Sequence, residues 1–455
     1  MGLSPRFFKL GWGGQSLEIL REFIEKNLDM LQSKENTLPW PPAIVQPRWR
    51  TIWETRRAVL QEGVFPTPVD DELKELLPPE SHMARVRLLM PRSSLRQEMA
   101  CVLHLAGTGD HGFDMRLKLG GPLLEQGVAT MVLESPFYGK RRPVDQKGSR
   151  LRYVSDLLAL GRTTIEESRS LLHWAREDMG FGKLGICGLS MGGVHASMVG
   201  SLHPYPIAVT PLLAPHSAAV AFCEGVLSLT TDWDVLARDT TLSKAFTSRV
   251  NVQPTANFAS ASPPLSSEVR AATDNHTADP IAQGPTPSNF ASSVSAKSLN
   301  GSIELPAKYS GVEALNQTSE RVSSNQGSGS RDSDSGSPEP SSGILNLEDE
   351  LASEEAASVA VAAVAAGYSL EETRARLQEV LSLTDVTRFP CPEKAEAVIL
   401  VAATNDAYIP QHSVERLQKA WPGMEVRWVV GGHVSSYLLH SKAFRQAIVD
   451  SLSRI

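Results

Sequence analysis

A serine lies at the centre of the stretch GLSMG, residues 188 to 192, and the short apolar run that begins at Lys183 leads directly into it. Glycines two residues before and after a serine are needed in a sharp strand-to-helix turn, because side chains there would collide with the neighbouring backbone. Such a turn directs the hydroxyl at a helix N-terminus, where free N–H groups favour negative charge. The pattern predicts that Ser190 is a nucleophile. A tight packing turn without chemistry is the alternative.

A nucleophilic serine needs a base that accepts its proton and a third group that orients the base. Asp406 follows the apolar run AVILVAATN, and His433 follows VRWVVGG, about one helix and one strand further along the chain. The order serine, acid, histidine is that of the α/β hydrolases, so we predict a triad of Ser190, Asp406 and His433. The alternatives are Asn405 or Glu134 as the acid and His104 or His111 as the base.

A glycine-rich loop, HLAGTGDHG, follows a predicted strand and begins at His104. An oxyanion needs a second N–H donor besides that of the residue after the nucleophile. We therefore assign the two donors to the backbone of Met191 and of Thr108. A phosphate-binding loop is not expected here, because neither Gly-Lys-Ser/Thr nor GxGxxG follows.

A second loop, LESPFYGKRRP, follows another predicted strand and contains Phe137, Tyr138 and Arg141. Open α/β sheets bind ligands at the carboxyl ends of their strands, so these side chains are candidates for a substrate pocket. The aromatic pair would contact an acyl group, and Arg141 or Arg142 would hold a phosphate or carboxylate. A structural loop with solvated charges is the alternative.

Predicted strands and helices alternate through much of the chain, which is typical of an α/β protein with a mostly parallel sheet. Several of the strands are apolar along their whole length, which indicates that helices cover both faces. The predicted strands are 82–91, 99–107, 128–136, 183–190, 206–215, 395–406 and 425–432, and the predicted helices are 121–127, 160–180, the segment from Met191, 413–421 and 441–455.

Composition divides the chain into four parts. Residues 1–80 are predicted to be a helical arm, 81–247 the first part of the core with the nucleophile, and 344–455 a helical flank followed by the acid and the base. Between them, residues 248–343 are rich in Ser, Asn and Pro and have no sustained period. Such a segment buries too little apolar surface to offset its ordering entropy. We therefore expect a disordered insertion between the sixth and seventh strands of an α/β-hydrolase fold, which here are the predicted strands 206–215 and 395–406.

Several motifs resemble the α/β-hydrolase domain-containing protein 18 family, namely HLAGTGDHGFDMR, LESPFYGKRRP, GICGLSMGGVHAS, NDAYIP and WPGMEVRWVVGGHVSSYLL. The resemblance covers most of the chain outside the insertion. It implies an α/β-hydrolase fold and a serine hydrolase with Ser190, Asp406 and His433 as its triad. It specifies no substrate. An ester or lipid acyl ester is our first expectation, and a peptidase, an acyltransferase or a catalytically silent binding protein are the alternatives.

The formal net charge of −7 gives no broad basic field, so neither nucleic acid nor an anionic membrane is an expected partner over the whole surface. Four widely spaced cysteines without a CxxC pair indicate reduced, buried thiols, and we expect no metal and no cofactor. We predict no transmembrane helix and no signal peptide. We expect an intracellular protein that is not secreted. The cytoplasm is the expected compartment, and an organelle such as the mitochondrion is the alternative.

The N-terminal arm contains an apolar stripe at helical spacing, made of Leu17, Leu20, Ile24 and Leu28. Before it, RFFKLGW places aromatic residues beside basic ones. One interpretation is a helix and an ordered arm packed on the hydrolase body. The other is a peripheral membrane contact that brings the active site to lipid esters. Phe7, Phe8 and Trp12 would then be the inserted side chains.

Overall fold

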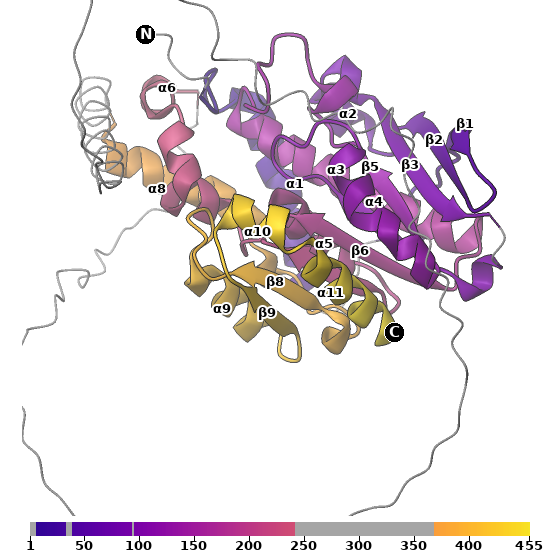
Figure 1. The fold of residues 1–455 in the computed structure, drawn as a ribbon. Helices are drawn as coiled ribbons and strands as arrows, with labels where there is room; N and C mark the ends of the chain where they lie inside the picture. The colour runs from indigo at the N-terminus through magenta and orange to yellow at the C-terminus, as the bar shows by residue number, and fades with distance from the viewer. Residues whose placement is uncertain (1–5, 33–38, 93–94, 242–367) are drawn as a thin grey trace, which may run out of the picture. The chain divides into compact units, whose positions relative to one another are not determined.

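The computed structural model of this chain describes residues 6–32, 39–92, 95–241 and 368–455. The predicted insertion at 248–343 and the beginning of the predicted helical flank lie outside the described residues. A nine-stranded sheet in the order β1-β2-β3-β5-β4-β6-β7-β8-β9 is the central element (Figure 1). Its strands are β1 (Arg48–Glu54), β2 (Ala58–Pro66), β3 (Met83–Pro91), β4 (Ala100–Leu105), β5 (Val128–Leu133), β6 (Lys183–Leu189), β7 (Ala208–Leu212), β8 (Ile399–Ala403) and β9 (Glu425–Val429).

The sheet is parallel from β5 to β9 and antiparallel from β1 to β5. Every residue of β4, β5, β7 and β8 is buried. Strands that read as continuous apolar runs need cover on both faces, and the sheet has it. The α/β-hydrolase fold expected from the sequence is therefore confirmed. The segment between β7 and β8 contains the predicted insertion.

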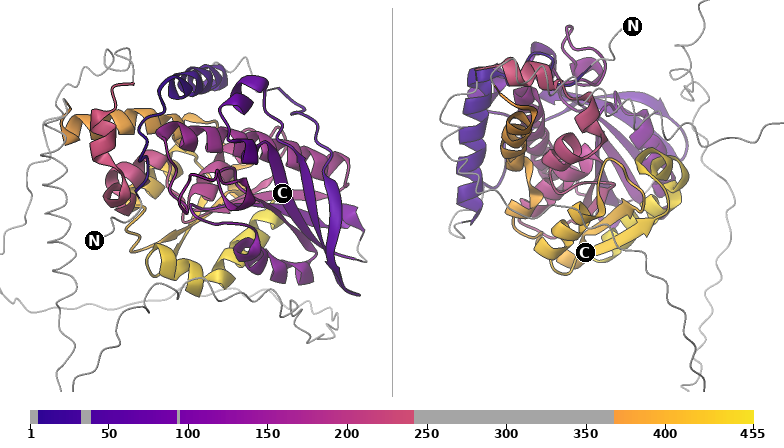
Figure 2. Two further views of the ribbon diagram at one scale, coloured as in Figure 1. Left: turned by 90° about the horizontal axis from the view of Figure 1, so that it is seen from above. Right: turned by 90° about the vertical axis from the view of Figure 1, so that its left-hand side faces the viewer.

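Helices cover both faces of the sheet, as Figures 1 and 2 show. On one face α4, α5 and α9 pack through side chains such as Leu171, Val194 and Leu417. On the other face α3 and α11 pack through Leu119 and Phe444. The helices are α1 (Gly14–Gln32), α2 (Asp71–Glu75), α3 (Asp114–Gly120), α4 (Val154–Glu177), α5 (Met191–Ser201), α6 (Trp233–Arg238), α8 (Leu370–Leu381), α9 (Gln411–Ala420), α10 (His433–Leu439) and α11 (Ser441–Ser453).

The prediction of a helical arm over residues 1–80 is wrong for residues 48–66. Among the described residues of this part, α1 and the short α2 are α-helical, whereas β1 and β2 form an antiparallel hairpin that extends the sheet beyond β3. Buried and less buried residues largely alternate along β2. That period of two is the signal of a half-buried strand, and AVLQEGVFP carries it in the sequence.

The aromatic residues of the N-terminal arm are core residues. Phe7 and Phe8 are fully buried and Trp12 is 1% exposed. The Phe7 backbone N–H donates to Thr230 O at 2.8 Å, and the Trp12 indole N–H donates to Leu236 O at 2.9 Å. These side chains are not available to a membrane, so the structure does not support the proposed membrane contact of the arm. Helix α1 packs on α4, and Figure 2 shows it in indigo at the outer side of that layer.

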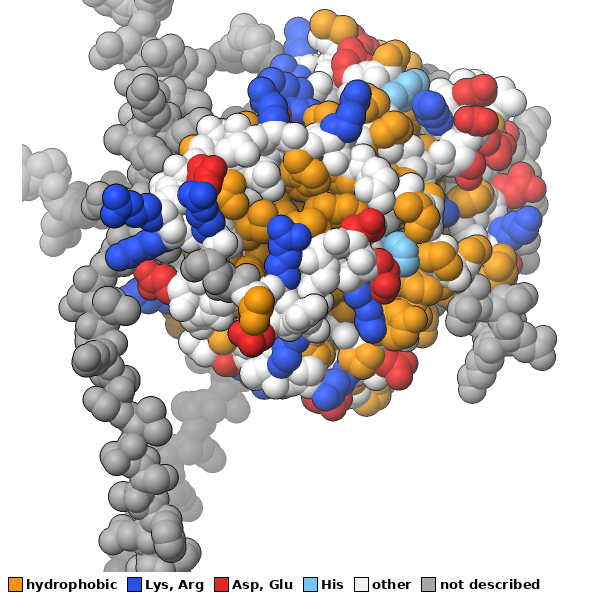
Figure 3. All heavy atoms as spheres, turned by 90° about the vertical axis from the view of Figure 1, so that its right-hand side faces the viewer, with side chains coloured by type: hydrophobic (Ala, Val, Ile, Leu, Met, Phe, Trp, Pro, Cys, Tyr) orange, Lys and Arg blue, Asp and Glu red, His pale blue; other side chains and the backbone are white. Residues whose placement is uncertain are grey.

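The surface in Figure 3 carries basic and acidic side chains interspersed, with hydrophobic side chains gathered in a central hollow.

All four cysteines are free thiols, and Cys391 is the one that is partly exposed. Within the described ranges, no cluster of side chains has the composition of a metal site. None of the described helices is both long enough and apolar enough to cross a bilayer.

Candidate active site

Ser190 occupies the turn between β6 and α5 in a backbone conformation that L-residues rarely adopt, with φ 53° and ψ −118°. Its N–H donates to Leu212 O on β7 at 2.8 Å, and its carbonyl oxygen accepts from Gly193 N at 2.9 Å. Hydrogen bonds from the sheet and from the helix thus hold the residue in place. Backbone strain of this kind persists only when its surroundings impose it, and it is frequent at active sites.

The two glycines that flank Ser190 are required by close backbone approach. A Cβ on Gly188 would lie 2.1 Å from Gly192 O, and a Cβ on Gly192 would lie 2.5 Å from Leu105 O. Real Cβ atoms do not approach backbone oxygens this closely. The collision that the sequence pattern implies is therefore present in the structure, and a side chain at either position would force the neighbouring backbone to move.

Asp406 and His433 form a direct pair at the ends of β8 and β9. The His433 Nδ1 lies 2.7 Å from Asp406 Oδ2, and the two side chains are 12% and 2% exposed. The other carboxylate oxygen accepts the backbone N–H groups of Tyr408 at 2.9 Å and Ile409 at 3.1 Å. Because the carboxylate accepts and does not donate, it favours the tautomer with the proton on Nδ1 and leaves Nε2 free to accept a proton.

The ring of Tyr408 stacks on the His433 imidazole, with ring centroids 4.7 Å apart and an interplanar angle of 29°. Tyr408 and Ser190 line the same pocket. Within the described part of the chain, the Ser190 hydroxyl has no hydrogen bond, so the structure brings Asp406 and His433 into contact but does not form the serine–histidine bond. His433 is the first residue of helix α10.

The two predicted oxyanion donors lie together at the mouth of this pocket. Thr108 Oγ1 is 3.8 Å from Met191 Sδ, and both residues line the pocket with Ser190. In the described ranges no backbone-to-backbone hydrogen bond uses the N–H of either residue. Free N–H groups beside a nucleophile at a helix N-terminus are what an oxyanion hole requires.

Arg116 of α3 holds the loop that carries Thr108, and the sequence analysis did not single it out. Its side chain is buried and pairs with Asp110 Oδ2 at 2.6 Å. It also donates to the carbonyl oxygens of His104, at 3.2 Å, and of Gly112. One guanidinium therefore joins the end of β4 to two points of the loop. The sequence offered little signal for this role, because most of the acceptors are backbone carbonyl oxygens that only the fold brings to Arg116.

The pocket beside Ser190 is mostly apolar and has a cavity volume of about 100 Å³. Side chains from α1, α4 and α5 line it, with others from the segments after β7 and around residues 383–389. Leu28 of α1, Leu158 of α4 and Met198 of α5 are representative. Such a lining favours a hydrophobic group.

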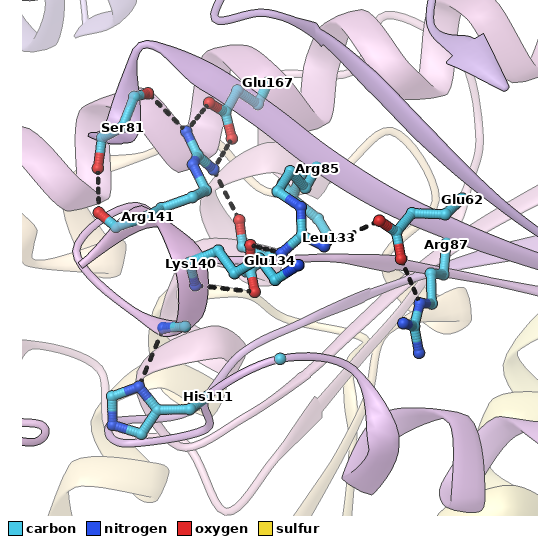
Figure 4. Close-up of polar contacts among 12 residues, drawn as sticks. Glu62, Ser81, Arg85, Arg87, His111, Leu133, Glu134, Lys140, Arg141 and Glu167 are labelled. Atoms are coloured by element: carbon cyan, nitrogen blue, oxygen red, sulfur yellow. Dashed lines mark hydrogen bonds and ion pairs between the residues drawn. The ribbon is translucent and has the colours of Figure 1, made fainter. Parts of the chain in front are cut away.

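Phe137, Tyr138 and Arg141, which the sequence analysis assigned to a substrate pocket, do not line the pocket beside Ser190. All three are fully buried. Figure 4 shows the Arg141 guanidinium directed at Glu167 of α4, and its Nη1 lies 2.9 Å from that carboxylate. Arg141 also donates to Ser81 O at 3.0 Å. A buried guanidinium needs such partners, so Arg141 is part of a structural ion pair and is not a free anion site.

The alternative acid and bases are engaged elsewhere. Glu134 forms an ion pair with Arg85 at 2.7 Å, also drawn in Figure 4. His104 is buried against Cys187, and burial lowers the pKa of His104 to about 3. His111 accepts a backbone N–H at 3.0 Å, and its pKa is lowered by burial. Asp406 and His433 remain the acid and base candidates that are paired with each other.

The sheet order, the turn at Ser190 and the loops around it define an α/β hydrolase. The family described as alpha/beta hydrolase domain containing 18 matches residues 5–454, and the chain belongs to that family.

Solved structures similar to this chain include acetyl xylan esterase 1 from Thermoanaerobacterium sp. JW/SL YS485, with a TM-score of 0.42 and 10% identity over 96% of both chains. Another is acetyl xylan esterase from Paenibacillus sp. R4, with a TM-score of 0.42 and 10% identity over 94% of this chain and 93% of that chain. A third is Est1E from Butyrivibrio proteoclasticus with ferulic acid bound, with a TM-score of 0.40 and 12% identity over 82% and 96%.

Proposed function

We propose that this chain is a serine hydrolase that cleaves an acyl ester through an acyl-enzyme intermediate. The observation that carries the proposal is the strained Ser190, held at the β6–α5 turn with its side chain at an apolar pocket. The pair of Asp406 and His433 supports it, since it supplies a base that is already oriented.

In the proposed mechanism, His433 Nε2 accepts the proton of the Ser190 hydroxyl as Oγ attacks the ester carbonyl carbon. The backbone N–H groups of Met191 and Thr108 stabilise the negative oxygen that forms. The C–O bond to the alcohol then breaks, and the leaving oxygen takes the proton from His433. A water molecule, deprotonated by His433, attacks the acyl-enzyme and releases the acid together with free Ser190. Asp406 stabilises the imidazolium in both halves.

The pocket supports a substrate with a hydrophobic acyl chain, such as a lipid acyl ester. Burial of apolar surface contributes about 25 cal/mol per Å², so each methylene that enters the pocket strengthens binding. The value of kcat/KM should therefore rise with acyl chain length until the pocket is filled.

Hydrolysis of para-nitrophenyl esters of increasing chain length tests the proposal on the full chain. The wild-type protein should release nitrophenol, and Ser190→Ala should not. The matched control is Ser197→Ala on the same helix. Its buried hydroxyl has no hydrogen-bond partner among the described residues and does not line the pocket. It should keep the wild-type rate.

The same assay separates the other acyl chemistries. Faster cleavage of the matched amides would identify a peptidase, and transfer of the acyl group to an added alcohol in preference to water would identify an acyltransferase. A folded protein that hydrolyses none of these esters and amides, and transfers no acyl group, would refute the enzymatic proposal and indicate a binding protein.

A further inference from the structure

Helix α5 presents one face to the pocket beside Ser190, and one residue of that face is polar. The residues of α5 and its C-terminal end that line the pocket recur at a helical spacing of three or four and are Met191, Val194, His195, Met198 and Leu202. A helix face that lines an apolar pocket is expected to be apolar throughout. His195 is the exception, and the proposed mechanism does not use it.

The His195 side chain has no hydrogen-bond partner among the residues that the structure describes, although the residue is only 6% exposed. Burial lowers its pKa to about 4, so the imidazole is neutral near pH 7. A neutral imidazole has one donor and one acceptor. The ring nitrogens of His195 are not fully enclosed by protein and the residue lines the pocket, so a ligand group in the pocket can supply the missing partner.

A side chain larger than glycine on the neighbouring helix would crowd the His195 imidazole. Gly161 of α4 lies against the ring, and a Cβ at this position would lie 3.1 Å from His195 Nε2, closer than an ordinary contact. The neighbouring Arg162 also lines the pocket, and it shares the Glu166 carboxylate with Arg169, at 2.5 and 3.1 Å. One carboxylate compensates the charge of two guanidinium groups only in part, so the preference for an uncharged oxygen rests on the neutral imidazole of His195.

We propose that His195 and Gly161 form a polar subsite in the pocket that binds an uncharged oxygen, a hydroxyl or a carbonyl, on the acyl chain of the substrate. His195 follows Ser190 by five residues, which places the subsite about 7 Å along the α5 axis from the nucleophile. The enzyme would thus prefer oxygenated acyl chains that carry the oxygen at one distance from the ester. This inference rests on the proposed function for the identity of the ester, but the subsite itself can be tested by binding alone.

The experiment measures binding of methyl octanoate and its hydroxylated analogues to the full chain with Ser190→Ala, so that no turnover occurs. One positional isomer should bind about fivefold more tightly than methyl octanoate, the gain from one hydrogen bond to a neutral group. Adding His195→Leu should remove that difference while methyl octanoate still binds. Equal preference for the hydroxylated ester with and without His195 would overturn the proposal.

Three further variants separate the subsite from a packing role. His195→Gln should retain part of the preference, because it keeps a donor and an acceptor. Gly161→Ala should reduce the preference, since its Cβ crowds the imidazole. Met198→Leu on the same helix face should change the affinity for both esters together.

An ordered water as the permanent partner of His195 would leave the two esters indistinguishable, which also refutes the inference. Because binding is the measured quantity, the result holds whether or not the wild-type protein hydrolyses esters. A failure of the proposed function and a failure of the subsite are therefore seen in different experiments.

Discussion

Replacement of Asp406 by asparagine tests how the acid acts. One carboxylate oxygen accepts two backbone N–H groups, and the other lies 2.7 Å from His433 Nδ1. Asparagine can keep its carbonyl oxygen on the two backbone donors. Its NH₂ group then faces Nδ1 and forces that nitrogen to accept. The imidazole proton moves to Nε2, and His433 can no longer accept the serine proton.

The expected effect on catalysis is large and the effect on stability is small. A wrong imidazole tautomer lowers kcat by about 10⁴-fold in a serine triad, which corresponds to about 5.5 kcal/mol of transition-state stabilisation. The two retained backbone hydrogen bonds should limit the change in the free energy of unfolding to about 1 kcal/mol. Ester hydrolysis and urea unfolding of Asp406→Asn measure the two quantities.

The matched control is Asn405→Ala, since Asn405 is the exposed neighbour in the same turn and its side chain accepts only from Thr404. It should keep the wild-type kcat. The reasoning is refuted if Asp406→Asn retains kcat within about tenfold of wild type, or if Asn405→Ala is impaired to the same degree.

Three further predictions concern other parts of the structure. Gly192→Ala should lower kcat by about 10² to 10³, which is the effect of losing one oxyanion donor. The added Cβ would lie 2.5 Å from the carbonyl oxygen of Leu105 at the end of β4 and would displace the loop that follows. Unchanged ester hydrolysis would contradict this. Glu167→Gln should lower the free energy of unfolding by about 3 to 5 kcal/mol, because it leaves Arg141 buried without its carboxylate partner. In urea unfolding, the double variant Arg141→Met with Glu167→Leu should recover the lost stability. The pKa of His195 is about 4 in the folded protein against 6.5 in the unfolded chain, so between these pH values the unfolded state binds more protons. The free energy of unfolding should therefore fall as the pH drops through this window, by about 2 kcal/mol at pH 5. His195→Leu should lose this part of the pH dependence, and an identical pH profile of unfolding in both proteins would show that it does not arise from His195.

The features that the sequence predicted correctly are those set by local pattern. Continuous apolar runs predict the buried parallel strands. The flanking glycines of Ser190 predict the strained turn because one of the collisions they avoid, between Gly188 and Gly192, involves residues only four positions apart. The order of Asp406 and His433 after late strands follows from the topology of a parallel sheet, in which carboxyl ends meet at one edge. The catalytic roles of these residues remain predictions.

The features that the sequence missed depend on partners far away in the chain. In the sequence, Arg141 lies in a loop of basic and aromatic residues that is typical of an exposed anion site. Only the fold brings Glu167 of α4 to it. In the sequence, Trp12 lies near basic residues, a pattern typical of a membrane anchor. In the structure its indole N–H donates a hydrogen bond to the carbonyl oxygen of Leu236, 224 residues away. His195 lies in a run of small residues that shows no sign of a pocket, which forms only when α1 and α4 pack beside α5.

The identity of the nucleophile is the central claim, and mapping of a covalent adduct tests it most directly. The full chain is treated with a fluorophosphonate, digested and analysed by mass spectrometry. We predict a single phosphonylated residue, Ser190, and no adduct in Ser190→Ala. Labelling of a different residue, or equal labelling of the Ser190→Ala protein, would contradict the account.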